Sequence, residues 1–196
     1  NTFVGGGGDD SGYGITMDSS GNVFVKGESV ASWGSPVRAH SGGGVDGFAA
    51  KLDSSGNLLW NTFLGGGGGD WCNGSGIALD STGNVYIGGY SFSVSWGSPI
   101  RPHSGGYDAF AAKLDGSGAL LWNTFLGGAG SDNSFGLTLD PAGNVLMTGD
   151  SDASWGSPLS AHHGGLDVYV AKLDGSGTLL WNTFLGGSNW DWVYNI

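Results

Sequence analysis

The chain has 196 residues, of which 42 are glycine, and only 12% are charged, about half the share that is usual in a globular domain. Glu28 is the single glutamate among 17 acidic residues, and the abundant Gly, Asp, Ser and Asn favour turns over helix. This composition excludes a helical bundle and a helix-covered α/β enzyme. Nine Trp, nine Phe and six Tyr supply core side chains that a disordered chain lacks. The sequence therefore predicts an all-β protein.

Charge and cysteine content limit the classes of partner. The formal net charge is −11 and the isoelectric point is near 4.2, so electrostatic binding to nucleic acid or to an anionic membrane is unfavourable. No apolar run approaches the roughly 18 residues of a membrane span, and we expect no membrane insertion. Cys72 is the only cysteine, which excludes an intramolecular disulfide. The low charge and the Gly, Ser and Asn content are typical of an extracellular bacterial protein.

An internal repeat organises the whole chain. The string Trp-Asn-Thr-Phe-Leu-Gly-Gly occurs at 60–66, 122–128 and 181–187, and residues 1–6 are a copy that lacks the Trp. Self-similarity at a fixed period indicates a repeat architecture. We therefore interpret residues 1–196 as one repeat array, with units 1–60, 61–122 and 123–181 and a partial unit 182–196.

Each unit has four short strand patterns in the same order. In the first unit they cover residues 14–18, 23–27, 48–53 and 58–63, and a long loop with Ser-Trp-Gly-Ser-Pro separates the second from the third. The first two strands and the last two are joined by turns that begin with Asp and contain Gly. Such a Gly supplies the positive φ of a hairpin. We expect positive φ at Gly21, Gly56, Gly83, Gly118, Gly143 and Gly177.

Four antiparallel strands in a repeat of about 60 residues are typical of a β-propeller blade. The strings Gly-Asn-Val-Tyr-Ile-Gly-Gly-Tyr, Ser-Trp-Gly-Ser-Pro-Ile-Arg, Asp-Ala-Phe-Ala-Ala-Lys-Leu-Asp and Leu-Trp-Asn-Thr-Phe-Leu-Gly-Gly resemble the bacterial β-propeller repeat family SBBP over essentially the whole chain. The resemblance implies three blades plus part of a fourth, in a large secreted or surface-anchored protein. That family has no established catalytic residues, so the resemblance implies none here.

The ends of the chain fall inside strand patterns. Residues 1–4 copy the fourth strand of a blade, and residues 192–196 align with the start of a first strand. The chain begins with Asn1 and shows no signal peptide. Our first expectation is that the chain is a piece of a longer repeat protein, and the second is that copies of it assemble with each other. In both cases we expect the termini to pair with protein outside this chain.

The acidic residues and histidines recur once per unit. The Asp-Ser-Ser-Gly-Asn turns resemble part of a calcium loop but lack its further carboxylates, so we favour Asp as a turn former. For the second acidic set, hydrogen bonds to backbone amides are favoured over metal binding. Equivalent histidines on adjacent blades lie too far apart for one zinc ion, which favours a structural role. We expect no metal and no cofactor. The second acidic set is Asp10, Asp70, Asp132 and Asp191, and the histidines are His40, His103 and His162.

The tryptophans form two recurring sets. Trp60, Trp122 and Trp181 belong to fourth strands, where we expect packing between blades. Trp33, Trp96 and Trp155 lie in the long loops. Exposed Trp rings beside polar groups can stack on sugars, but the same rings can fold back to cover the rim between blades, which we favour because the motif recurs in every unit.

Nucleophilic catalysis has no support in the sequence. There is no Gly-x-Ser-x-Gly motif and no pair of glutamates, and Cys72 occurs in one unit only. The leading hypothesis is a non-enzymatic extracellular or cell-surface structural repeat module that serves in scaffolding, adhesion or assembly. The alternative is a multivalent lectin that binds glycans at Trp33, Trp96 and Trp155. Exposure of these three rings separates the two hypotheses.

Overall fold

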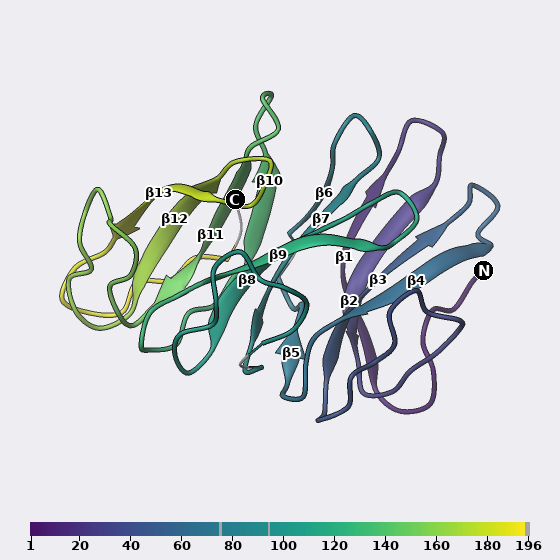
Figure 1. The fold of residues 1–196 in the computed structure, drawn as a ribbon, viewed down its shortest axis with the longest axis horizontal. Helices are drawn as coiled ribbons and strands as arrows, with labels where there is room; N and C mark the ends of the chain where they lie inside the picture. The colour runs from purple at the N-terminus through teal and green to yellow at the C-terminus, as the bar shows by residue number, and fades with distance from the viewer. Residues whose placement is uncertain (75, 94, 195–196) are drawn as a thin grey trace.

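The computed structural model describes residues 1–74, 76–93 and 95–194, and all of their regular structure is β-strand. The strands form three antiparallel sheets, each made of consecutive strands, and the sheets stand side by side as a fan (Figure 1). They do not close into a ring. The structure thus confirms the all-β class and the four-stranded blade. None of the described residues forms a helix with the length and hydropathy of a membrane span.

The blades follow one another along the chain. Blade 1 contains β1 (Asp10–Met17), β2 (Val23–Ser29), β3 (Asp46–Leu52) and β4 (Leu58–Leu64). Blade 2 contains β5 (Asp70–Trp71), β6 (Ile77–Leu79), β7 (Val85–Ser91), β8 (Asp108–Leu114) and β9 (Leu120–Leu126). Blade 3 contains β10 (Gly136–Leu139), β11 (Val145–Ser151), β12 (Asp167–Leu173) and β13 (Leu179–Leu185). The repeat units counted from Asn-Thr-Phe therefore begin within a fourth strand rather than at a blade boundary.

The first strand differs most between blades. In blade 1 it is continuous, with a register shift between Gly12 and Gly14. In blade 2 it is divided into β5 and β6, which both pair with β7. In blade 3 a single bridge between Asp132 and Ser151 precedes β10. The strand predicted at 14–18 is therefore longer than expected, because its pairing with β2 extends back to Asp10.

The hairpin turns confirm the sequence prediction. Gly21, Gly56, Gly83, Gly118, Gly143 and Gly177 all have positive φ, between +79° and +87°. In the first turn, one carboxylate oxygen of Asp18 accepts hydrogen bonds from the amides of Ser20 and Asn22, each at 2.9 Å. The same pattern recurs at Asp53. The Asp side chain thus organises the turn locally, two and four residues along the chain.

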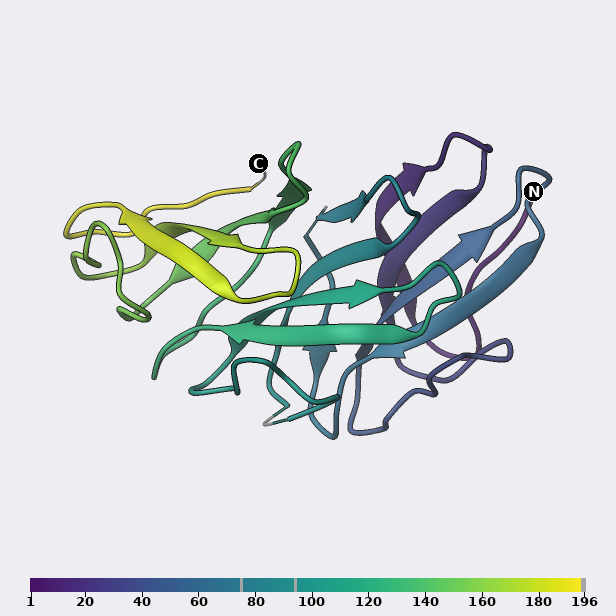
Figure 2. The same cartoon turned by 45° about the horizontal axis from the view of Figure 1, so that its top comes forward.

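Each blade has an apolar face toward the preceding blade, here called the proximal face, and one toward the following blade, the distal face. Between blades 1 and 2, Phe24 and Leu64 of the distal face pack on Ile87 and Leu114 of the proximal face. Between blades 2 and 3 an equivalent core contains Tyr86, Leu126, Val145, Met147 and Leu173. The blades are therefore joined by continuous hydrophobic cores. Figure 2 shows the three sheets side by side in the order of the chain.

The chain ends add no strand to these sheets. Residues 1–9 and the described residues 186–194 form no β-ladder, apart from one bridge between Leu166 and Trp190. Thr2 donates a side-chain hydrogen bond to the Gly56 carbonyl oxygen at 2.6 Å, and Val4 packs on the proximal face of blade 1. Residues 195–196, part of the segment expected to begin another first strand, lie outside the described residues.

We predict that Gly83→Ala destabilises the protein by about 1–2 kcal/mol, the cost of the left-handed conformation for a residue with a Cβ. Gly83 has φ +84°, and a Cβ there would meet no atom within 4 Å, so backbone strain is the only cause. Urea unfolding of the variant measures the loss. Gly116→Ala, in a neighbouring turn and without a positive φ, is the control, and an equal loss in both variants would contradict the argument.

Candidate functional site

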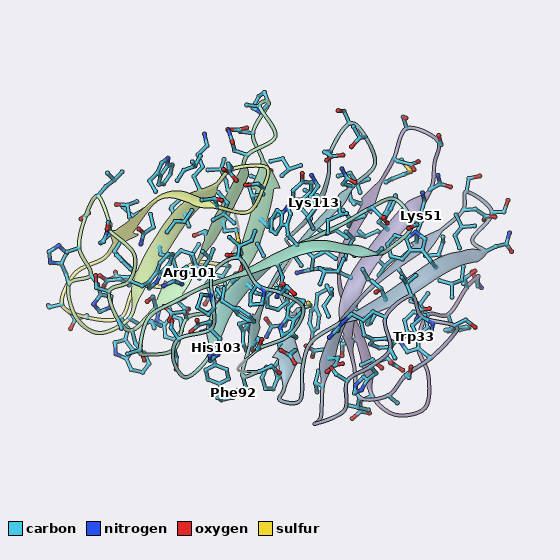
Figure 3. All side chains as sticks on the ribbon, viewed as in Figure 1. Trp33, Lys51, Phe92, Arg101, His103 and Lys113 are labelled. Carbon is cyan, nitrogen blue, oxygen red and sulfur yellow. The ribbon has the colours of Figure 1, made fainter. Side chains whose placement is uncertain are left out.

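The long loops bring the candidate residues to one rim of the fan. Figure 3 shows Trp33, His103 and Phe92 toward this rim, and Lys51 and Lys113 toward the opposite one. The loop between the second and third strands and the connection to the next blade both lie here, as four antiparallel strands in sequence require. The candidate residues of the three blades thus occupy repeated positions on one side of the molecule.

The loop tryptophans are buried. Trp33 is 7% exposed, Trp96 3% and Trp155 4%. Each ring packs edge-on against two aromatic side chains of its own blade; for Trp96 these are Phe110 and Phe125, at centroid distances of 5.1 and 6.0 Å. Sugar stacking needs an open ring face, so the prediction of a glycan site at Trp33, Trp96 and Trp155 is corrected: these rings cover the edge of the inter-blade core.

The Asn of the Trp-Asn-Thr-Phe-Leu motif holds the same loop. The side-chain amides of Asn61, Asn123 and Asn182 donate to the carbonyl oxygens of Trp33, Trp96 and Trp155 at 2.8–2.9 Å. The glycine after each Trp has φ near +65°, and a Cβ on Gly97 would lie 2.7 Å from the Asn123 side chain. Ser-Trp-Gly and Trp-Asn-Thr, far apart in the sequence, therefore specify one contact.

The histidines anchor the same loop to the second strand. Nε2 of His40, His103 and His162 donates to the carbonyl oxygens of Ser29, Ser91 and Ser151, each at 3.1 Å. Nδ1 of His40 accepts from the amide of Gly42 at 3.0 Å. The contacts of all three rings with Ser carbonyl oxygens confirm the prediction of structural histidines.

Arginines link neighbouring blades at this rim. Arg38 donates to the carbonyl oxygens of Phe63 and Gly65 and lies 5.6 Å from the centre of the Trp96 ring in blade 2. Arg101 repeats this arrangement on Trp155 of blade 3, at 5.7 Å. A guanidinium over an indole face is an attractive cation–π contact. Blade 3 has Ser160 at the corresponding position.

The recurring acidic residues close the glycine-rich connections. Asp10, Asp70, Asp132 and Asp191 each accept a hydrogen bond from the amide four residues earlier, at 2.8–2.9 Å. These amides belong to Gly6, Gly66, Gly128 and Gly187. The prediction that these carboxylates bind backbone amides is confirmed.

The comparison with known families agrees with this geometry. The family model described as SBBP, Beta-propeller repeat, matches residues 60–93, which run from β4 of blade 1 through the end of β7. The chain contains an SBBP repeat. The strands β9, β10 and β11 repeat β4, β6 and β7 of this segment. Its polar contacts recur as well: Asn123 donates to the Trp96 carbonyl oxygen as Asn61 does to that of Trp33, and Asp132 accepts from the Gly128 amide as Asp70 does from that of Gly66. No curated protein matches the chain.

Two carboxylates meet at the glycine connection that follows each blade. A Cβ on Gly127 would lie 2.6 Å from both Asp108 and Asp132, and both residues are buried. Burial, together with the nearby Asp108 carboxylate, raises the pKa of Asp132 to about 7; burial raises the pKa of Asp70 as well. Within the ranges 1–74, 76–93 and 95–194, no three His, Cys, Asp or Glu side chains are grouped so that they could hold a metal ion.

Blade 2 carries an aromatic cluster that the repeat pattern does not predict. Trp71 stacks on Tyr90 at 5.4 Å, and Phe92 lies 3.6 Å from Tyr107 between ring centres. Asn73 donates to the Tyr90 hydroxyl oxygen at 3.0 Å, and Phe92 is 44% exposed. Trp71 belongs to β5 and Asn73 follows it, Tyr90 belongs to β7, and Phe92 and Tyr107 lie in the long loop. Their only sequence signal is an excess of aromatic residues in one repeat unit.

Lys26 is a second feature without a counterpart in the other blades, which have Gly88 and Thr148 at this position. The side chain is fully buried between blades 1 and 2. Its Nζ donates to the Gly88 carbonyl oxygen at 2.7 Å. Burial lowers the pKa of Lys26 to about 8. The lysine therefore ties two blades together rather than facing a ligand.

We predict that His103→Ala lowers the free energy of unfolding by about 1–3 kcal/mol, because the buried Ser91 carbonyl loses its partner and the ring leaves Phe125, 5.5 Å away. Chemical denaturation measures the change. His163→Ala is the matched control: His163 is exposed and its substitution should stay within about 0.5 kcal/mol of wild type. Equal stability of the His103 and His163 variants would refute the anchoring role.

We predict that the free energy of unfolding falls less between pH 4 and pH 8 in the Asp132→Asn variant than in the wild-type protein. In the folded state the pKa of Asp132 is about 7, above its ordinary value of 3.8. In the unfolded state the Asp132 carboxyl therefore loses its proton at a lower pH than in the folded state. The free energy of unfolding falls as the pH rises between these two pKa values, by up to about 1.4 kcal/mol per pH unit for one group. The amide side chain of the variant does not titrate, so the slope is shallower in urea unfolding at successive pH values.

Asp115→Asn is the control for this experiment. Hydrogen bonds from Ser117 and from backbone amides lower the pKa of Asp115 in the folded state. The stabilisation by ionised Asp115 is therefore complete above about pH 4 and is lost only as the pH falls below that value. This variant should keep the wild-type slope between pH 5 and pH 8. Parallel curves for wild type and Asp132→Asn would show that Asp132 does not carry the pH dependence.

Proposed function

We propose that the chain is a non-enzymatic structural module of an extracellular or cell-surface bacterial protein, in which β-propeller blades serve as scaffold, adhesion or assembly units. The observation that carries the proposal is the identical use of polar side chains in all three blades. In each blade His donates to a Ser carbonyl at 3.1 Å and Asn donates to a Trp carbonyl at 2.8–2.9 Å.

These contacts support an architectural role because each one fixes a loop of its own blade. The histidines and asparagines donate to backbone carbonyl oxygens. The aspartates of the glycine-rich connections accept from backbone amides. Catalytic groups are usually arranged once in a molecule and converge on a shared pocket. A side chain that repeats the same backbone contact in every blade instead maintains the repeat.

The setting is supported by composition and by the family. The chain is 12% charged and has 42 glycines, which suits an exposed repeat protein more than a cytosolic enzyme. The SBBP family resembled by the sequence occurs in large secreted or surface-anchored bacterial proteins. Burial of Trp33, Trp96 and Trp155 removes the open rings that the lectin alternative needs.

Antibody labelling of intact cells of the source organism tests the proposed location. Antibodies raised against residues 1–196 should label cells that have not been permeabilised, while antibodies against a cytosolic marker label only permeabilised cells. Labelling that appears only after permeabilisation would overturn the extracellular or cell-surface role. This measurement does not depend on any association between copies.

A further inference from the structure

The aromatic cluster of blade 2 stands on backbone that all three blades share. Each of its rings is directly adjacent in the sequence to Asp70, Ser91 or Asp108, and these three residues recur at the same positions in blades 1 and 3. The backbone contacts recur as well. The Phe92 amide donates to the Gly69 carbonyl oxygen at 2.9 Å, and the equivalent bonds in blades 1 and 3 measure 3.3 and 3.2 Å. The four rings of the cluster are those of Trp71, Tyr90, Phe92 and Tyr107.

The other two blades carry different side chains at these four positions. Trp71 pairs with Tyr90 between strands as Ser11 pairs with Glu28, which aligns the blades residue by residue. The positions hold Ser11, Glu28, Val30 and Val45 in blade 1, and Asn133, Asp150, Asp152 and Leu166 in blade 3. Aromatic residues therefore occupy all four positions in one blade only, on an unchanged scaffold.

The rings pack on one another and take no part in the cores between blades. The Tyr107 ring centre lies 6.0 Å from that of Trp71, 5.6 Å from that of Tyr90 and 3.6 Å from that of Phe92. None of the four rings belongs to the hydrophobic cores of the described residues. The junction between blades 1 and 2 forms with no aromatic residue at these positions, so the rings are not required to join blades.

The cluster is open to solvent in a blade that has a neighbour on each side. Phe92 is 44% exposed, and the other three rings are half-buried. Blades 1 and 3 flank blade 2 within this chain, so the exposed rings do not belong to a sheet face that lacks its adjoining blade. Figure 3 shows Phe92 at the rim formed by the long loops. Exposed aromatic patches on such loops mark interaction sites.

The polar groups of the cluster are neutral and can form hydrogen bonds. The Tyr90 hydroxyl oxygen accepts from Asn73 at 3.0 Å, which leaves its O–H available as a donor. Burial raises the pKa of Tyr90, and the Glu28 carboxylate of blade 1 raises it as well, so this hydroxyl keeps its proton at neutral pH. Tyr107 adds a second phenol. Uncharged donors beside a carboxylate disfavour an anionic ligand.

The size of the cluster indicates a small ligand or one unit of a polymer. A fully exposed aromatic side chain offers about 200 Å², and Phe92, the most open of the four, is 44% exposed. The open aromatic area is therefore on the order of 300 Å². A stable protein interface buries about 800 Å² on each partner, far more than these rings supply.

We propose that the blade 2 aromatic cluster binds a neutral saccharide, with one sugar ring on the open face of Phe92 and sugar hydroxyls bound to the phenols of Tyr90 and Tyr107. A pyranose combines an apolar C–H face with a hydroxyl edge, which matches an aromatic surface bordered by neutral hydrogen-bonding groups. The site goes beyond the structural role proposed above. It occurs once in the chain and uses none of the buried loop tryptophans.

Isothermal titration of the purified chain 1–196 tests the site. The probes are neutral hexasaccharides of glucose, mannose, galactose or N-acetylglucosamine, and at least one should bind saturably with a dissociation constant at or below about 1 mM. Phe92→Val introduces the residue that blade 1 has at this position, so the fold accommodates it. This variant should raise the dissociation constant at least about 10-fold, because the stacking surface is lost.

Tyr107→Phe separates ligand binding from packing. The variant keeps the ring beside Phe92 and removes only the hydroxyl, so it should retain the wild-type thermal unfolding while its dissociation constant rises about 3- to 10-fold. Phe3→Ala is the matched control, since Phe3 is 97% exposed and lies outside the cluster. It should bind the saccharide as the wild-type chain does. Circular dichroism verifies that each variant is folded.

Four results would overturn the proposal. They are a wild-type chain that binds none of the saccharides, a Phe92→Val or Tyr107→Phe chain that binds as tightly as wild type, an equal loss in Phe3→Ala, and tighter binding of hexalysine than of any saccharide. The last would identify a cationic ligand instead. Because titration uses the purified chain and does not depend on where the protein is found, the saccharide site and the surface location fail or hold separately.

Discussion

The structure depends on sheets that are apolar on both faces. A blade can bury these faces only against another blade, and the residues that do so alternate along each strand: Phe24 and Leu64 face forward, while Phe48 and Phe63 face backward. The indole of Trp60 then joins the outer strand of one blade to the turn of the next. Burial of apolar area supplies the driving force, and the tryptophan fixes how far one blade is displaced from its neighbour.

The loops follow from that packing, because a blade edge covered by a loop contains backbone groups that need partners. His, Asn and Asp provide them at fixed repeat positions. Aspartate occurs in two different electrostatic environments. Asp115 lies in an exposed turn, where hydrogen bonds lower its pKa, and Asp132 lies in a buried connection, where desolvation raises its pKa. The acidic composition is therefore divided between groups that stabilise the fold when ionised and groups that stabilise it when protonated.

Much of this arrangement is predictable from the sequence because its determinants are local. Asp18 and Gly21 specify a turn within four residues, and Asp70 binds the amide of Gly66 four residues earlier, so the pattern alone indicates both contacts. The stacked aromatics Trp71 and Tyr90 are 19 residues apart and occur in one blade, so neither periodicity nor turn chemistry points to them. Buried Lys26 is equally unexpected, since lysine is rarely found inside without a partner.

The strands, the turns and the repeat could be predicted from the sequence, since they depend on short-range hydrogen bonding and on the alternation of apolar residues. The burial of each tryptophan could not, because it depends on contacts between residues that are far apart in the chain. Trp33 and Trp181 recur once per repeat unit in the same way, but Trp33 is enclosed by Phe48 and Phe63 of its own blade, whereas Trp181 is half-buried. Burial of a side chain depends on what the fold places against it, and the sequence around a residue does not contain that information.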